Sequence, residues 1–221
     1  MTIGYGPSIV TSGLVLALDA ADRNSYPGSG TTWTDLSGKG ITGAFGGSTS
    51  YSSANGGALV FNGGTDNVFA SGIVSGEQYT WAAWVNSSSV STEQNILSMN
   101  GPYFMRITNS TVRFNILTSG GWLFQQGTTT LSNNTWYYLT MVFDSANSLW
   151  KGYINGVQEF SVTKTGTHGY SSFYVYIGYT PQGGENAPFN GKIASIQYYN
   201  RALTATEIQQ NFNATRSRFG I

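Results

Sequence analysis

The side chains that could carry out acid–base or nucleophilic chemistry are few and scattered in this sequence. Ten residues are acidic, and no two of them lie two positions apart, the spacing that places two carboxyl groups on one face of a strand. Glycoside hydrolysis needs two carboxyl groups about 5–10 Å apart. His168, the only histidine, lies in a Gly-flanked turn, and no Gly-x-Ser-x-Gly motif accompanies it. We therefore predict a protein without catalytic residues, and not an enzyme.

Aromatic side chains near turns are the better candidates for a binding role. Aromatic residues make up 14% of the chain. Trp122 follows two glycines, Tyr170 follows Gly169, and Tyr179 precedes a Thr-Pro pair. An exposed ring beside amide and hydroxyl groups could bind a sugar, so these three residues are our candidate ligand-binding residues. The alternative is that aromatic residues at strand ends cover the hydrophobic core.

Composition limits the classes of partner. Charged residues are only 9% of the chain, against about 25% in an average soluble protein, and the formal net charge is zero. Strong binding to nucleic acid is therefore not expected, and Arg216 and Arg218 near the end of the chain release too few counterions to change this. Weak surface charge favours self-association, so we expect a homo-oligomer. A surface rich in Ser, Thr, Asn, Gly and Tyr also suits neutral polar ligands.

Cysteine usage and hydropathy bear on metals and location. Cysteine is absent, which excludes disulfides and thiolate metal sites, and one histidine is too few for a histidine-based site. No apolar run approaches the ~20 residues that span a bilayer, so no membrane insertion is expected. No charged segment followed by an apolar one opens the chain. We expect a protein that folds in a cytoplasm and has no signal peptide.

Hydrophobic alternation predicts an all-β chain of roughly a dozen strands. Residues 22–38 are expected to be a long loop, and residues 79–86, apolar on both faces, a central strand. The clearest hairpin joins residues 149–154 and 157–162 through Asn155-Gly156. The other expected strands are residues 13–20, two within 58–70, 95–99, 103–107, 111–116, 135–144 and 172–179.

The segment from Phe189 to Phe212 is predicted to hold a turn, a strand and the one helix. Asn190-Gly191 is a turn dipeptide, and alternation follows it. Thr204 and Glu207 have the spacing of a capping box, while Leu203 and Ile208 have that of a hydrophobic staple. We assign residues 13–221 to a single domain. Residues 1–12 are an edge segment, a disordered terminus or an arm that docks on a neighbouring subunit.

Three segments together resemble a known family. They are residues 14–40, with LVLALDA, SYPGSGTTW and DLSGKG; residues 61–68, FNGGTDNV; and residues 190–208, with NGKI, YNRALT and a Glu-Ile helix. This pattern is similar to that of laminin G-like domains, which belong to the concanavalin A-like lectin and glucanase superfamily. The resemblance implies a two-sheet antiparallel jelly roll with a short C-terminal helix.

The same resemblance suggests a function. The opening segment looks like that of laminin G-like proteins of tailed phages, notably cyanophages, which are virion components. It implies a non-enzymatic virion protein, such as a capsid decoration, head-fibre or tail-fibre protein, whose partners are other virion proteins. The alternative is a carbohydrate-binding adhesin or lectin that recognises host surface polysaccharide. Both functions can coexist in one protein.

The resemblance also suggests that the chain could bind a calcium ion. Laminin G-like domains often hold a calcium ion at one rim of the sandwich, and the matching acidic position here is Asp66. Calcium accepts carboxylate, amide and carbonyl oxygens and needs no His or Cys. The alternative, which we favour, is that Asp66 closes an Asx turn. Asp35 is expected to brace its loop.

Overall fold

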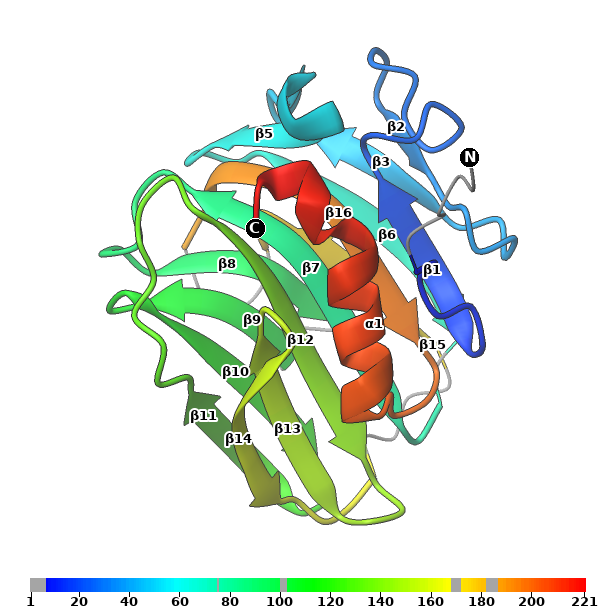
Figure 1. Cartoon of the computed structure of the whole chain (residues 1–221), viewed down its shortest axis with the longest axis vertical. Helices are drawn as coiled ribbons and strands as arrows, with labels where there is room; N and C mark the ends of the chain where they lie inside the picture. Colours follow the sequence, from blue (N-terminus) through cyan, green and yellow to red (C-terminus); the bar gives the residue numbers. More distant parts are fainter. Residues whose placement is uncertain (1–6, 75, 100–102, 168–171, 182–186) are drawn as a thin grey trace, which may run out of the picture.

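The chain forms two antiparallel β-sheets that pack face to face, with one α-helix on the outside (Figure 1). The computed structural model describes residues 7–74, 76–99, 103–167, 172–181 and 187–221. Sheet A has the order β14-β13-β12-β7-β16-β5-β4, with β1 also paired to β16. Sheet B has the order β11-β10-β9-β8-β15-β6-β3-β2. The two-sheet jelly roll predicted from the sequence is confirmed.

The elements have the following bounds. Sheet A contains β1 (Leu14–Asp19), β4 (Ser50–Ser52), β5 (Ala58–Asn62), β7 (Tyr79–Ser87), β12 (Trp136–Asp144), β13 (Leu149–Ile154), β14 (Val157–Thr163) and β16 (Asn190–Tyr199). Sheet B contains β2 (Thr32–Thr34), β3 (Thr42–Gly46), β6 (Asn67–Val74), β8 (Gln94–Met99), β9 (Tyr103–Thr108), β10 (Thr111–Thr118), β11 (Gly121–Gln126) and β15 (Ser172–Ile177). The helices are η1 (Ala54–Gly56), α1 (Ala205–Thr215) and η2 (Arg216–Phe219).

The packing of strand β7 between the core and the helix side explains why its sequence is apolar on both faces. Trp81 and Val85 point into the core between the sheets, where they join the main cluster of buried side chains. Trp84 points the other way and packs against Phe212 of α1 and Phe219 of η2, at ring distances of 5.8 and 4.2 Å. Each face of the strand therefore buries apolar surface, which is the main stabilising contribution in such a core.

Helix α1 lies across the outer face of sheet A (Figure 1). It begins at a capping box, as predicted: the Thr204 hydroxyl accepts a hydrogen bond from the Glu207 amide, and the Glu207 carboxylate accepts one from the Thr204 amide. Leu203 and Ile208, the predicted staple, are both buried in one small cluster that also contains Tyr199. The helix is therefore held by its cap and by its apolar side.

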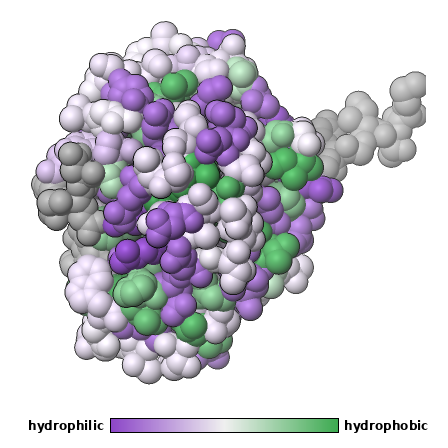
Figure 2. All heavy atoms as spheres, turned by 90° about the vertical axis from the view of Figure 1, so that its left-hand side faces the viewer, coloured by the Kyte–Doolittle hydropathy of each residue, from purple (hydrophilic) through white to green (hydrophobic). Residues whose placement is uncertain are grey.

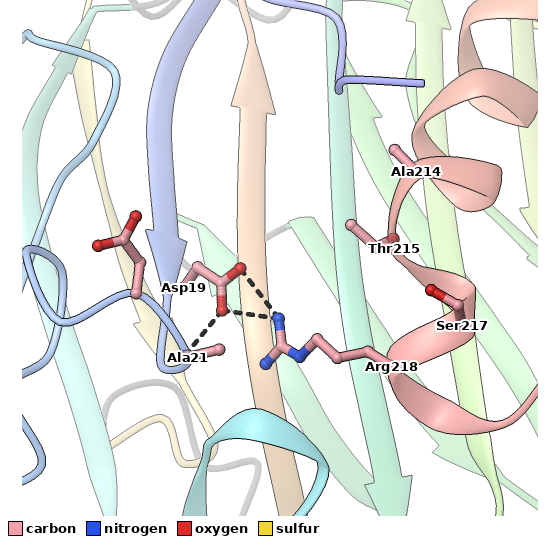
Figure 3. A pocket seen from close by; sticks show the side chains of 7 residues that line it. Asp19, Ala21, Ala214, Thr215, Ser217 and Arg218 are labelled. Carbon is pink, nitrogen blue, oxygen red and sulfur yellow. Dashed lines mark hydrogen bonds and ion pairs between the residues drawn. The ribbon is translucent and has the colours of Figure 1, made fainter. Parts of the chain in front are cut away.

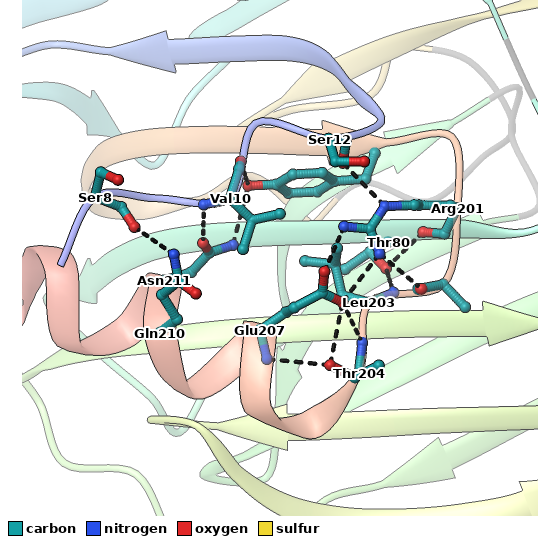
Figure 4. A network of polar contacts seen from close by, with 12 residues as sticks. Ser8, Val10, Ser12, Thr80, Arg201, Leu203, Thr204, Glu207, Gln210 and Asn211 are labelled. Atoms are coloured by element: carbon teal, nitrogen blue, oxygen red, sulfur yellow. Dashed lines mark hydrogen bonds and ion pairs between the residues drawn. The ribbon is translucent and has the colours of Figure 1, made fainter.

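Residues 7–12 form no strand but dock on α1 and the end of β16 (Figure 4). The Val10 amide donates to Asn211 Oδ1 at 2.8 Å, and the Tyr199 hydroxyl donates to the Val10 carbonyl at 3.0 Å. The side chains of Gln210 and Arg201 donate to the carbonyls of Ser8 and Ser12. The edge-strand alternative is thus wrong for the described part of this segment, which belongs to the helix side of the fold.

Two predictions about turns had opposite outcomes. Asn155 and Gly156 have φ values of 51° and 78°, as a tight hairpin turn between β13 and β14 requires, and this prediction is confirmed. The predicted turn at Asn190-Gly191 is wrong, because both residues lie inside β16. Gly191 pairs there with β5 on one side and β7 on the other. A Cβ at Gly191 would lie 2.2 Å from the Asn86 carbonyl oxygen, so glycine serves close packing.

Several short strands were not predicted. The loop expected at residues 22–38 contains β2, and β3, β4 and β11 were also missed. The three-residue strands β2 and β4 are too short to show alternation, and β3 is interrupted by glycines. Strand β11 was taken for a turn because two glycines precede Trp122. Of these, β11 matters most, because it forms one edge of sheet B.

Candidate functional site

Aromatic and polar side chains alternate across the outer face of sheet B, the face turned away from sheet A. One row crosses six neighbouring strands in register: Phe124, Asn115, Phe104, Ser98, Tyr176 and Phe69. A second row crosses four strands beside it: Gln126, Arg113, Arg106 and Asn95. These residues, with Trp122, are called the sheet B face below. The residues that alternate with them along the same strands point into the core between the sheets. The side chains of the two rows therefore point away from sheet A.

The β11 end of this face is exposed. Trp122 and Phe124 retain 59% and 61% of their accessible surface, and both lie on the outward side of the strand. The guanidinium of Arg113 lies over the Phe124 ring, 4.6 Å from its centroid. Its Nε donates to Asn115 Oδ1 at 3.2 Å, which fixes the plane of the group. Rings and hydrogen-bonding groups are therefore available to a ligand side by side.

Deeper in the face, polar side chains are buried. Arg106 is only 4% exposed, bonds Glu93 Oε1 at 2.7 Å and lies 4.5 Å from the Phe104 ring centroid. Burial lowers the pKa of Arg106, because it disfavours the charged form. Asn95 and Ser98 are each 1% exposed, and their side-chain polar atoms have no hydrogen-bond partner among the residues that the structure describes. Such groups are rare in folded proteins and call for an explanation.

The far end of the face is aromatic. Phe69 lies 4.8 Å from Tyr176 and 5.9 Å from Tyr174, measured between ring centroids, and all three rings are partly exposed. Burial raises the pKa of Tyr176, with a smaller contribution from Tyr174, so its hydroxyl is protonated at neutral pH. The face therefore has partly or fully exposed aromatic rings at both ends, and the amide, hydroxyl and guanidinium groups between them are largely buried.

The surface beside this face is largely polar. Figure 2 shows the side that lies at the left of Figure 1, where hydrophilic and intermediate residues dominate and the apolar patches are small and separate. Large contiguous apolar patches commonly mark protein-docking or membrane surfaces. The mosaic seen here suits a hydrated, polar ligand better.

Two of the three aromatic residues that the sequence singled out lie within the described residues. Trp122 is exposed on the sheet B face, although on a strand and not in a turn. Tyr179 follows β15 and is half-buried. Tyr170 and the lone His168 lie outside the described residues. Most of the face was missed, because single-sequence reasoning looked for aromatics at turns, whereas the alignment of strands creates this site.

Asp66, the candidate calcium ligand, is buried and braces two loops. Its Oδ1 accepts the Ser48 amide at 2.6 Å, and its Oδ2 accepts the Asn62 amide at 2.9 Å. Among the residues that the structure describes, no three His, Cys, Asp or Glu side chains gather in a way that could hold a metal ion. The bonds explain the carboxylate as a structural brace, and a calcium role at Asp66 stays a prediction. Asp35 likewise accepts hydrogen bonds from the Ala17 and Ser37 amides.

The acidic side chains serve the fold throughout the described residues. Apart from the exposed Glu77, each of them accepts at least one hydrogen bond: Asp19, Asp22, Asp35, Asp66, Asp144, Glu93, Glu159 and Glu207. Glu159, for example, accepts four hydrogen bonds from Thr128 and Thr129, and those bonds outweigh burial and lower its pKa. Most of these acids are thus engaged by hydrogen bonds within the fold, which favours a binding role over acid–base catalysis.

Away from the sheet B face, an open hollow lies near the C-terminal end of α1 (Figure 3). It is open, has a volume of about 530 Å³, and is lined by Asp19, Asp22, Thr215 and Arg218, among others. Arg218 Nη1 contacts both oxygens of Asp19, at 2.8 and 2.9 Å, and Nη2 donates to the Gly57 carbonyl. Arg218 is therefore a brace between η2, β1 and the loop at η1, and not a solvated tail.

Comparison with known proteins identifies the family. A family model described as the concanavalin A-like lectin/glucanases superfamily, of the Laminin_G_3 type, matches residues 61–209. The chain therefore belongs to this superfamily, as its sequence predicted. No curated protein sequence matches it. Among the described residues, no helix has the length and apolar character needed to cross a membrane.

Solved structures share the fold at low sequence identity. Domain 4 of AbnA, an extracellular arabinanase from Geobacillus stearothermophilus solved with arabinotriose, has a TM-score of 0.68 and 21% identity over 91% of this chain and 98% of its own. The binding domain of Paraclostridial Mosquitocidal Protein 1 has a TM-score of 0.72 and 15% identity over 91% of this chain. A structure of botulinum neurotoxin type C, a toxin whose cell entry depends on two ganglioside molecules, has a TM-score of 0.73 and 13% identity. This chain spans about half the length of the two toxin chains, 52% in each case.

Proposed function

We propose that this protein is a non-catalytic module that binds carbohydrate through the sheet B face. The observation that carries the proposal is the register-aligned row of rings, amides and guanidinium groups across that face. Two of the similar proteins add support, since one was solved in complex with arabinotriose and the other depends on two ganglioside molecules for cell entry. The engaged state of the acidic side chains supports binding without hydrolysis.

The chemistry of such a face suits sugars. A pyranose or furanose ring has an apolar side of C–H groups, which packs on an aromatic ring, and a rim of hydroxyls, which needs planar donors and acceptors. Trp122 and Phe124 supply exposed rings. Asn115 and Arg113 supply donors and an acceptor beside them, already oriented by their mutual hydrogen bond. Groups held in place before binding lose less entropy when the ligand arrives.

Loss of a stacking ring tests the proposal. Trp122→Ala should weaken binding to any oligosaccharide that the wild type retains on a glycan array, by about tenfold, which corresponds to ~1.4 kcal/mol. The melting temperature should change little, because the ring is exposed. Val157→Ala is the matched control, since Val157 is 65% exposed but lies on β14 of sheet A. Array binding that is equal in the wild type and both variants, or absent from all three, contradicts the proposal.

We also propose that the module is a component of a phage virion, displayed on the particle as a homo-oligomer. The support is the similarity of residues 14–40 to virion proteins of tailed phages and a chain with little charge to oppose self-association. Mass spectrometry of purified virions, with the copy number per particle, tests this role. A monodisperse monomer that never purifies with particles is the contrary result.

A further inference from the structure

A pair of like charges lies directly across two strands of the sheet B face. Arg106 of β9 and Arg113 of β10 are register partners in the antiparallel pair. Burial lowers the pKa of Arg106, and the nearby charge of Arg113 lowers it slightly further. Like charges placed directly opposite one another destabilise a sheet. Such a pair needs compensation, either from the protein or from a ligand.

The protein compensates one member of the pair. Glu93, which is 46% exposed, forms an ion pair with Arg106 at 2.7 Å. Arg113 has no carboxylate partner among the described residues: its Nε bonds the neutral Asn115, and its guanidinium plane lies over Phe124. The face therefore carries one uncompensated positive charge within the described residues, in a chain with no net charge.

The surroundings of Arg113 suit a planar anion. A guanidinium group presents its N–H donors in a fixed fork that matches a carboxylate in a bidentate way. Contact with the Phe124 ring and with Asn115 Oδ1 holds the plane of this fork. The exposed Phe124 ring under Arg113, with Trp122 two residues earlier on β11, can hold the sugar ring that bears the anion.

We propose that the sheet B face selects glycans that carry a carboxylate, such as uronic or sialic acids, and that Arg113 binds the carboxylate. This inference rests on the proposed carbohydrate-binding function and specifies its ligand class. The carboxylate would relieve the repulsion between the two arginines, so binding would gain free energy that a neutral sugar cannot supply. The preference should weaken as salt is added, because exposed charges are screened.

Pairs of ligands that differ only in charge separate the contribution of the carboxylate from that of the sugar ring. Uronate- and sialate-containing oligosaccharides are compared with their methyl esters, which keep the shape and remove the charge, first on an array and then by calorimetric titration. The wild type should bind the acid about tenfold more tightly than its ester. Arg113→Gln should abolish this preference, and Arg113→Lys should retain part of it, because lysine keeps the charge but loses the fork.

A second arginine provides the matched control. Arg216 also lies over an aromatic ring, Phe212, but on the helix side of the molecule. Arg216→Gln should leave the preference unchanged, and thermal unfolding of each variant checks its fold. Equal binding of acid and ester by the wild type overturns this inference and leaves the carbohydrate-binding function in place. If Arg113→Gln lowers the affinities for the acid and for the ester equally, this inference is likewise overturned and the carbohydrate-binding function stays in place. Absence of binding to every glycan overturns the proposed function and this inference with it.

Discussion

At the scale of single residues, the same side-chain types do different work according to their partners. Arg218 and Arg201 are fixed by carboxylates, Arg106 is buried in an ion pair, and Arg113 alone among these lies on a candidate binding face without an acid beside it. The residue type alone does not distinguish the roles of these four arginines. What separates a brace from a candidate ligand-binding group here is whether a carboxylate lies beside the guanidinium group.

The role of Asp66 as a structural brace can be tested by removing one of its two carboxylate oxygens. In Asp66→Asn, one amide N–H would face a backbone N–H at Ser48 or Asn62, because only one side-chain oxygen remains as an acceptor. We expect this variant to lose about 1–3 kcal/mol of unfolding free energy, measured by chemical denaturation. Asp22→Asn is a suitable control, since Asp22 accepts its bonds from Asn24 in an exposed turn.

The calcium prediction is examined in the same measurement. If Asp66 is a brace, the wild-type unfolding curve should be the same in EDTA and in millimolar calcium. A rise in stability with calcium that disappears in Asp66→Asn would instead identify this carboxylate as a metal ligand, because a ligand that binds only the folded state stabilises it.

At the scale of elements, the start of α1 is an electrostatic unit. Hydrogen bonds from Arg201, and then from Thr204, outweigh desolvation and lower the pKa of Glu207 to about 2. Because the folded pKa lies below the unfolded value of about 4.5, ionised Glu207 contributes its full stability above that pH. The contribution is lost as the pH falls through about 2.

Glu207→Gln should therefore destabilise the protein at pH 7 by about 1 kcal/mol, and the difference from the wild type should narrow as the pH falls from 4.5 towards 2. The effect is modest because Arg201 and Glu207 are 29% and 26% exposed and water screens their attraction. Denaturant titrations of both proteins across this pH range give the comparison. A constant difference at every pH would show that the charge of Glu207 is not the cause.

Strand β16 depends on a glycine where three strands approach closely. In Gly191→Ala the new Cβ would overlap the Asn86 carbonyl oxygen and lie 2.8 Å from Ser87 Cα, both of which are backbone atoms. We expect a loss of more than about 3 kcal/mol, or failure to fold, since overpacking and backbone strain add. Gly72→Ala is the control: its φ is 75°, but no atom lies within 4 Å, so only the backbone penalty of ~1–2 kcal/mol applies. Equal denaturation midpoints for the two variants would refute the packing argument.

The elements also show what single-sequence reasoning can and cannot reach. Long strands with clear alternation, the Asn155-Gly156 hairpin and the capped helix follow from local physics, so they were predictable. Strand β11 was not predictable, because it begins at the second of two glycines and gains its β structure from pairing with β10. The candidate face was also out of reach, because Asn95, Arg106 and Arg113 become neighbours only through the register of three strands.

At the scale of the whole molecule, the two outer surfaces have separate tasks. Sheet A is covered by α1, η2 and residues 7–12, whereas the sheet B face carries the candidate binding groups. The two faces are separated by the core between the sheets. Changes on the helix side should therefore alter stability and leave ligand binding unchanged.

Removal of residues 1–12 tests this separation. The deletion would uncover Asn211 and Tyr199 and remove Val10 from its apolar cluster, which should cost about 2–4 kcal/mol of stability. Glycan affinity at a temperature where the variant is folded should equal that of the wild type. A deletion of residues 1–6 keeps the described contacts of Val10 and serves as the control. A glycan affinity that falls with the longer deletion would show that the two surfaces are coupled.

The docking of residues 7–12 beside α1 also determines how the domain would be oriented on a support. Pro7 lines one hollow together with Ala205, Gln209 and Gln210 of α1, so an anchor joined directly to Pro7 would start on the helix side. Copies fixed through that end to a bead, a chip or a particle would all turn the opposite sheet outward. Many weak contacts could then be made at once, and avidity would rise well above the affinity of one domain.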